Sequence, residues 1–167
     1  MQRAYTVRGD FQRGDIMRKP VKTHLPAVKA PLEWATTADG ILYTAQIPNR
    51  EDGSIETGDI RAQAELTLSN LRRTVEAAGG SMDDVTQVLV YLPDPADFAG
   101  MNEVYSRSFR PPYPNRATIV ANLMVPGAKI EVVAYAHVGG RGAATARPKA
   151  KAKAKKRAPV KRARRRR

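Results

Sequence analysis

The segment "PNRATIVANLMVPGAKIEVVAYA", residues 114–136, decides the fold because it holds two apolar runs joined by the turn "VPGA". The runs at residues 116–124 and 129–138 have the length and the β-branched, apolar character of strands. Each also carries a charge where the pattern otherwise indicates buried strand: Arg116 opens the first run and Glu131 lies inside the second. Charged residues are rarely buried without a partner, so these two are the first candidates for a functional site.

Three further strands precede this segment. Residues 33–38 and 41–47 flank Asp39-Gly40, a two-residue turn typical of a β-hairpin. Residues 84–92, "DVTQVLVYL", are β-branched and apolar over the length of one strand.

Two helices lie between the strands. Asp59 is the predicted cap of the first, and Gly79-Gly80 ends it. Its apolar positions recur at helical spacing: Ile60, Ala64, Leu68, Leu71, Val75 and Ala78. The second helix starts with Asp94 as cap and Pro95 in the first turn. Its predicted buried face consists of Phe98, Met101, Tyr105 and Phe109. The order ββαβαββ predicts an α+β fold, a mixed sheet with two helices on one face.

The last strand is apolar on both of its faces, since side chains alternate along a strand. One face consists of Ile130, Val132, Ala134, Ala136 and Val138, and the other of Lys129, Glu131, Val133, Tyr135 and His137. The helices cover only one face of the sheet. We therefore expect a partner subunit, most simply a second copy of the chain, to cover the face with Val133 and Tyr135.

With 167 residues, 42% of them hydrophobic, the chain can bury one core and has room for one domain.

Charge divides the chain into three parts. Its net charge of +13 comes from the ends, because residues 141–167 hold fourteen Lys or Arg and no acid, and residues 1–29 hold seven basic and two acidic side chains. We expect an irregular basic arm over 1–29, a mildly acidic domain over 30–140, and a disordered Lys/Arg/Ala-rich tail over 141–167.

Several classes of function are disfavoured by composition. Without cysteine, the chain has no disulfide or thiol nucleophile, and with only His24 and His137 it predicts no metal site. No run approaches the roughly 18 apolar residues of a membrane helix, so we expect no membrane insertion. A cytoplasmic protein is the simplest expectation, with a nuclear or nucleoid location as the alternative that the basic tail offers.

Four stretches together resemble the RidA (YjgF/UK114) family of reactive intermediate imine and enamine deaminases. They are "PNRATIVANLMVPGAKIEVVA", "ILYTAQIP", "AQAELTLSNLRRTVEAAGGSMDDV" and "DFAGMNEVYSRSF", which run from about Trp34 to Val138 in the family's order. The resemblance implies a chorismate-mutase-like fold, assembled as a homotrimer with three clefts between subunits. It also implies hydrolysis of imino and enamino acids of the 2-iminobutanoate and 2-iminopropanoate type to 2-oxo acids and ammonia, without a cofactor.

The resemblance assigns the two strand charges to catalysis. Arg116 matches the arginine that grips the substrate carboxylate, a task suited to a planar, permanently charged fork. The alternative for Arg116 is an intrachain salt bridge. Glu131 matches the glutamate that positions or activates the hydrolytic water, and its alternative is a solvated glutamate on a half-exposed strand.

Further residues match secondary positions of the family's site. Thr44 stands where a serine is common and offers either a cleft hydroxyl or a packing contact. Asn102 matches a helix asparagine near the site, or serves only to hydrogen-bond its helix. Thr118 replaces a frequent cysteine, and its carbonyl is the candidate contact to the substrate nitrogen because that contact does not need the side chain.

The chain departs from the family pattern after Pro31. The family usually has a Pro-Tyr pair whose tyrosine closes the substrate pocket, whereas this chain reads "APLEWA". Leu32 or Trp34 is the candidate for that wall, and neither has a phenol hydroxyl. The departure motivates a second hypothesis, a non-catalytic trimer that binds nucleic acid.

The tail over 141–167 is the candidate polyanion-binding element. Its fourteen positive charges suit sequence-independent, salt-sensitive binding of phosphates, although it has no aromatic residue for base stacking. Nucleic acid is the leading partner, ahead of anionic membrane surfaces and acidic proteins. The alternative is a tail that only aids solubility. A ribonuclease activity, reported within the family, ranks last because no His or Lys cleavage constellation is evident.

Overall fold

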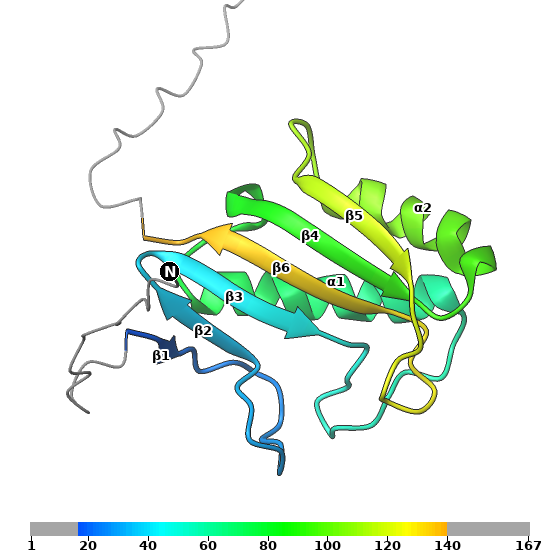
Figure 1. Ribbon diagram of the computed structural model, residues 1–167, viewed down its shortest axis with the longest axis horizontal. Helices are drawn as coiled ribbons and strands as arrows, with labels where there is room; N and C mark the ends of the chain where they lie inside the picture. Colours follow the sequence, from blue (N-terminus) through cyan, green and yellow to red (C-terminus); the bar gives the residue numbers. More distant parts are fainter. Residues whose placement is uncertain (1–16, 140–167) are drawn as a thin grey trace, which may run out of the picture.

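The computed structural model describes residues 17–139. Its secondary structure contains a six-stranded sheet and two α-helices. The strands are β1 (Lys19–Pro20), β2 (Ala35–Ala38), β3 (Ile41–Gln46), β4 (Val85–Leu92), β5 (Asn115–Val120) and β6 (Glu131–His137). The helices are α1 (Ile60–Ala77) and α2 (Phe98–Ser108), with short 3-10 turns at Met82–Asp84 and Pro95–Asp97. Both helices lie on the same face of the sheet, which confirms the predicted mixed sheet with two helices on one face (Figure 1).

The strands occur in the spatial order β1-β2-β3-β6-β4-β5. All neighbours are antiparallel except β4 and β5, which are parallel and are joined through α2. A parallel pair needs such a crossover, so α2 is held against the β4–β5 end of the sheet. The face predictions for β6 are confirmed, since Val132, Ala134 and Ala136 are buried whereas Glu131 and Tyr135 are partly exposed.

Local chemistry determines where the elements begin and turn. Asp39 and Gly40 have φ values of 50° and 75°, as the turn between β2 and β3 requires. The Asp59 carboxylate caps α1 by accepting a hydrogen bond from the Ala62 N–H at 3.0 Å. Asp94 caps the turn before α2 in the same way, accepting from the Ala96 N–H at 2.8 Å.

The structure differs from the sequence predictions at three places. The N-terminal arm contributes β1, a strand too short to show any periodicity. The strand predicted over 116–124 ends at Val120, and Met124 beyond it is 93% exposed in the loop that follows. Phe98 was predicted to be buried, but it is 43% exposed at the first position of α2.

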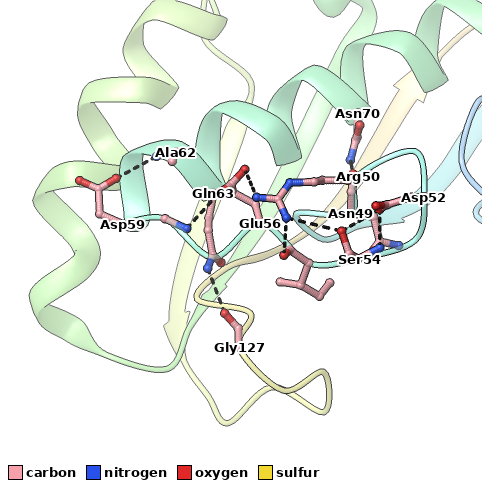
Figure 2. Close-up of polar contacts among 12 residues, drawn as sticks. Asn49, Arg50, Asp52, Ser54, Glu56, Asp59, Ala62, Gln63, Asn70 and Gly127 are labelled. Atoms are coloured by element: carbon pink, nitrogen blue, oxygen red, sulfur yellow. Dashed lines mark hydrogen bonds and ion pairs between the residues drawn. The ribbon is translucent and has the colours of Figure 1, made fainter.

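The side of α1 that faces the sheet is partly polar, which the apolar periodicity did not reveal. Its buried polar residues are Gln63, Thr67, Asn70 and Thr74, which we call the polar face of α1. Asn70 donates from Nδ2 to the Asn49 carbonyl at 2.8 Å and so holds the loop after β3 (Figure 2). Asn70 of the polar face therefore holds a loop against the helix through a specific hydrogen bond, whereas Thr67 bonds within α1 and Thr74 accepts from the Gln46 side chain of β3.

Gln63 makes two such bonds ahead of β6. Its Nε2 donates to the Gly127 carbonyl at 2.9 Å (Figure 2), and its Oε1 accepts from the Lys129 N–H at 2.7 Å. The side chain is 1% exposed. One buried amide thus fixes the turn from which β6 starts.

We expect Gln63→Ala to lower the free energy of unfolding by about 2 kcal/mol, at about 1 kcal/mol for each lost hydrogen bond. Chemical denaturation of the full chain at one fixed concentration measures the loss. The matched control is Glu65→Ala on the outer side of the same helix, where an exposed ion pair with Arg107 is removed and little stability is lost. Equal losses in the two variants would contradict the assigned role of Gln63.

Candidate active site

Arg116 lies on β5, the outermost strand, and points to the helix-covered side of the sheet. In the register of the parallel pair it stands opposite Val88 of β4, which is fully buried beneath the helices. Directly paired residues share a face of the sheet. The Arg116 guanidinium lies over the ring of Tyr105, 4.4 Å from its centroid, and 5.9 Å from the centroid of Phe98. Both rings belong to α2, so helix and edge strand together position the cation.

No carboxylate within residues 17–139 forms an ion pair with Arg116. Five other arginines of this region do pair with carboxylates: Arg50, Arg61, Arg73, Arg107 and Arg110. The intrachain salt bridge that was the alternative role for Arg116 is therefore absent from the described part of the chain. Its planar N–H groups remain available to an anion from outside this part.

An open pocket of about 490 Å³ adjoins the guanidinium. Its lining, which we call the Arg116 pocket, consists of Asn102, Tyr105, Ser106, Tyr113, Pro114 and Arg116. The structure thus brings Asn102 to the same pocket as Arg116, as the family resemblance implied. The substrate-binding role of both residues stays a prediction.

Tyr105 is the most buried aromatic side chain of the pocket, at 6% exposed. Its ring packs on Phe109, with 4.6 Å between centroids. Burial raises the pKa of the Tyr105 hydroxyl to about 12, although the positive charge of Arg116 acts in the opposite direction. The hydroxyl has no hydrogen-bond partner among the described residues. At neutral pH the guanidinium therefore rests on a neutral ring.

Glu131 lies on the opposite side of the sheet. It is the first residue of β6 and pairs with Tyr91 of β4, whereas the preceding pair in the register, Val90 with Val132, is buried under the helices. Since successive residues alternate between faces, Glu131 points to the open face. Within one copy of the chain, the sheet itself separates Glu131 from Arg116.

The two threonines of the predicted site lie on the helix-covered face. Thr44 pairs with Ala134 and is buried. Its hydroxyl donates a hydrogen bond to the Trp34 carbonyl at 2.7 Å and accepts one from Gln46 Nε2 at 2.7 Å. The hydroxyl therefore has a partner inside the protein both as donor and as acceptor. Thr118 follows Arg116 by two positions on β5, and its buried hydroxyl has no partner in the described region.

Leu32 and Trp34 lie next to β2, toward the opposite edge of the sheet from Arg116. Strands β3, β6 and β4 stand between β2 and β5. Leu32 is exposed and lines a separate pocket of about 470 Å³. The Trp34 indole N–H donates to the Pro26 carbonyl at 2.8 Å, which ties the indole to its own loop. One copy of the chain does not bring these two residues to the Arg116 pocket.

Ser106 and Tyr113 are pocket residues that the sequence did not predict, and Tyr105 was predicted only as a core residue. The spacing of Phe98 and Tyr105, seven residues or two helical turns, was the available signal, because such residues share one face of a helix. Tyr113 belongs to the proline-rich connection before β5, where periodicity carries no information.

Residues 17–139 contain no group of three or more His, Cys, Asp or Glu side chains that could hold a metal ion. Within the same residues, neither helix is long and apolar enough to cross a membrane.

The fold defines a class of small α+β domain, and its open pocket adjoins an arginine that pairs with no carboxylate of residues 17–139. The chain belongs to the family described as Endoribonuclease L-PSP, the RidA/YjgF family, which matches residues 22–138. The family resemblance predicted from the sequence is thereby confirmed.

Solved structures agree with this assignment. The chain is 31% identical to Escherichia coli TdcF, solved with bound serine, over 71% of this chain and 98% of that one, with a TM-score of 0.66. RidA from an Antarctic Psychrobacter is 29% identical over 72% and 99% of the two chains, with a TM-score of 0.67. For yeast Mmf1 the identity is 28%, the coverage 72% and 98%, and the TM-score 0.68.

Proposed function

We propose that the chain is a deaminase that hydrolyses 2-imino acids and their enamine tautomers to 2-oxo acids and ammonia. The observation that carries the proposal is the half-buried Arg116 guanidinium, which faces an open pocket and pairs with no carboxylate of the described residues. Membership of the RidA/YjgF family supports the proposal, as does serine, a small molecule with a carboxylate, in the related TdcF structure.

Hydrolysis of an imine requires the protein mainly to position the substrate and a water molecule. Arg116 binds the substrate carboxylate through two parallel N–H donors and so orients the imine carbon. Glu131 accepts a proton from a water molecule while the water oxygen attacks that carbon. The imine reacts in its N-protonated form, so the attack gives a neutral carbinolamine. Glu131 returns its proton to the nitrogen, the C–N bond breaks with release of ammonia, and the hydroxyl loses its proton to solvent to leave the 2-oxo acid.

A site that uses both side chains requires two copies of the chain, because Arg116 and Glu131 point to opposite faces of one sheet. The open face supports self-association, since Tyr43 and Ile119 expose apolar surface there and no helix covers it. We propose that three copies assemble so that Arg116 of one copy and Glu131 of the next meet in a shared cleft.

We expect Arg116→Ala to abolish catalysed ammonia release from an imino acid generated in situ by a coupled amino-acid enzyme. Arg116→Lys retains the charge but loses the fork, so it should recover only a small part of the activity. Glu65→Ala, on the outer side of α1, is the matched control and should behave as the wild type. If the assembled wild type releases no ammonia above the spontaneous rate from several precursors, the deaminase proposal is wrong.

Mixing two inactive variants tests whether the site is shared. Arg116→Ala and Glu131→Ala chains, dissociated together and reassembled in equal amounts, should regain about a quarter of wild-type activity, because a random trimer forms a complete site only where two intact residues meet. Activity is measured against each variant reassembled alone. If mixing restores nothing while each variant still forms trimers, both residues do not act in one intersubunit site.

A second candidate function rests on the charge of the C-terminal tail. Residues 141–167, which lie outside the described residues, contain fourteen Lys or Arg and no acid, whereas residues 30–140 are mildly acidic. Such a distribution supports binding of nucleic acid by charge alone, with release of counterions. This function is compatible with deamination, because the tail follows the domain in sequence.

We expect a chain that ends at Gly140 to lose salt-dependent binding to a duplex oligonucleotide, measured by fluorescence anisotropy between low and moderate salt. A full-length chain whose tail is scrambled in sequence should bind as the wild type, since the contacts are electrostatic. Unchanged affinity and salt dependence after truncation would show that the tail is not the binding element.

A further inference from the structure

Two aromatic rings of α2, those of Phe98 and Tyr105, lie near the Arg116 guanidinium. Phe98 and Tyr105 lie two helical turns apart on the helix face that meets β5. The Arg116 guanidinium carbon is 4.4 Å from the Tyr105 centroid and 5.9 Å from the Phe98 centroid, both within the range of cation–π attraction. Phe98, whose exposure the sequence pattern did not predict, is 43% exposed and is the more accessible of the two rings.

We propose that Phe98 and Tyr105 form an aromatic clamp that holds the Arg116 guanidinium by ring contacts and leaves its N–H edges free for a ligand carboxylate. Tyr105 is then a positioning residue, which acts on the ligand only through Arg116. The inference rests on the proposed role of Arg116 in carboxylate binding and adds the means by which this arginine is oriented.

The aromatic clamp holds Arg116 without occupying the N–H groups that a substrate carboxylate would bind. A protein carboxylate would hold the guanidinium through the same N–H groups that a substrate needs and would cancel its charge. An aromatic ring attracts the cation through its face, without using any N–H group. Within the described residues Arg116 has the rings and no such carboxylate.

Tyr105 is suited to this task by its surroundings. The neighbouring ring of Phe109, at 4.6 Å, supports it from within the core. Burial keeps the pKa of the Tyr105 hydroxyl at about 12, so the phenol stays neutral and does not compete with a carboxylate for the cation. The hydroxyl has no hydrogen-bond partner among the described residues, whereas the ring contacts both Arg116 and Phe109.

The test compares binding of 2-oxobutanoate, the product of the proposed reaction, with binding of its neutral amide, by NMR titration of the full-length protein. Tyr105→Leu should weaken binding of the acid by about three- to thirtyfold, the range of a cation–π contact, and leave the amide unchanged. Tyr105→Phe keeps the ring and should bind the acid as the wild type does. In an Arg116→Ala background, Tyr105→Leu should have no further effect on the acid.

Two further variants separate positioning from general damage to the core. Val104→Ala removes buried apolar volume from the same helix without removing a ring beside Arg116, and should preserve the preference for the acid. Phe98→Leu changes a residue that is 43% exposed, so we expect a smaller cost to folding and a test of the clamp even if Tyr105→Leu does not fold. It should weaken acid binding by a smaller factor than Tyr105→Leu.

The arginine side-chain spectrum tests the clamp without a ligand. Ring currents should shift the Arg116 Nε–H resonance, assigned by its loss in Arg116→Ala, and Tyr105→Leu should move it toward the other arginines. An unmoved resonance, or equal loss of acid and amide binding, overturns the clamp. If Arg116→Ala itself leaves acid binding unchanged, the proposed function fails; if only Tyr105→Leu and Phe98→Leu leave it unchanged, the positioning role alone fails.

Discussion

The two-residue period of a β-strand governs where the candidate site can form. Arg116 stands opposite Val88 and Glu131 opposite Tyr91, and these two partners lie three positions apart on β4. An odd separation puts the two charges on opposite faces. Neither register can slip by one residue without turning the buried valines of the sheet toward water, so the apolar pattern also fixes the sides on which the charges lie.

Hydrogen bonds from α1 fix the positions of two loops that the pairing of strands does not fix. Strands are ordered by their neighbours, but the loops that lead into them need separate anchors. Gln63 holds the residues just ahead of Glu131, and Asn70 holds the loop after β3. A face of α1 that was entirely apolar would bury as much surface but would leave these loops without defined positions.

Strong local signals made much of the fold predictable from sequence. The turn at Asp39-Gly40 and the caps at Asp59 and Asp94 follow from the chemistry of single residues. The family resemblance named Arg116 and Asn102 as candidate site residues, and the two line one pocket. The rest depends on contacts distant in sequence. The separation of Arg116 from Glu131 follows from strand register. Gln63 and Asn70 of the polar face carry no apolar signal, and their partners include backbone groups of loops distant in sequence.

The two edges of the sheet differ in a way that bears on the unassembled chain. At one edge β1 is only two residues long and contains Pro20, which has no N–H to offer an incoming strand. At the other edge β5 is six residues long, contains no proline, and ends with exposed Ile119 and Val120. A single copy of the chain therefore has one edge strand that is open to pairing with another chain. If the proposed assembly buries this strand, it also protects the chain from aggregation.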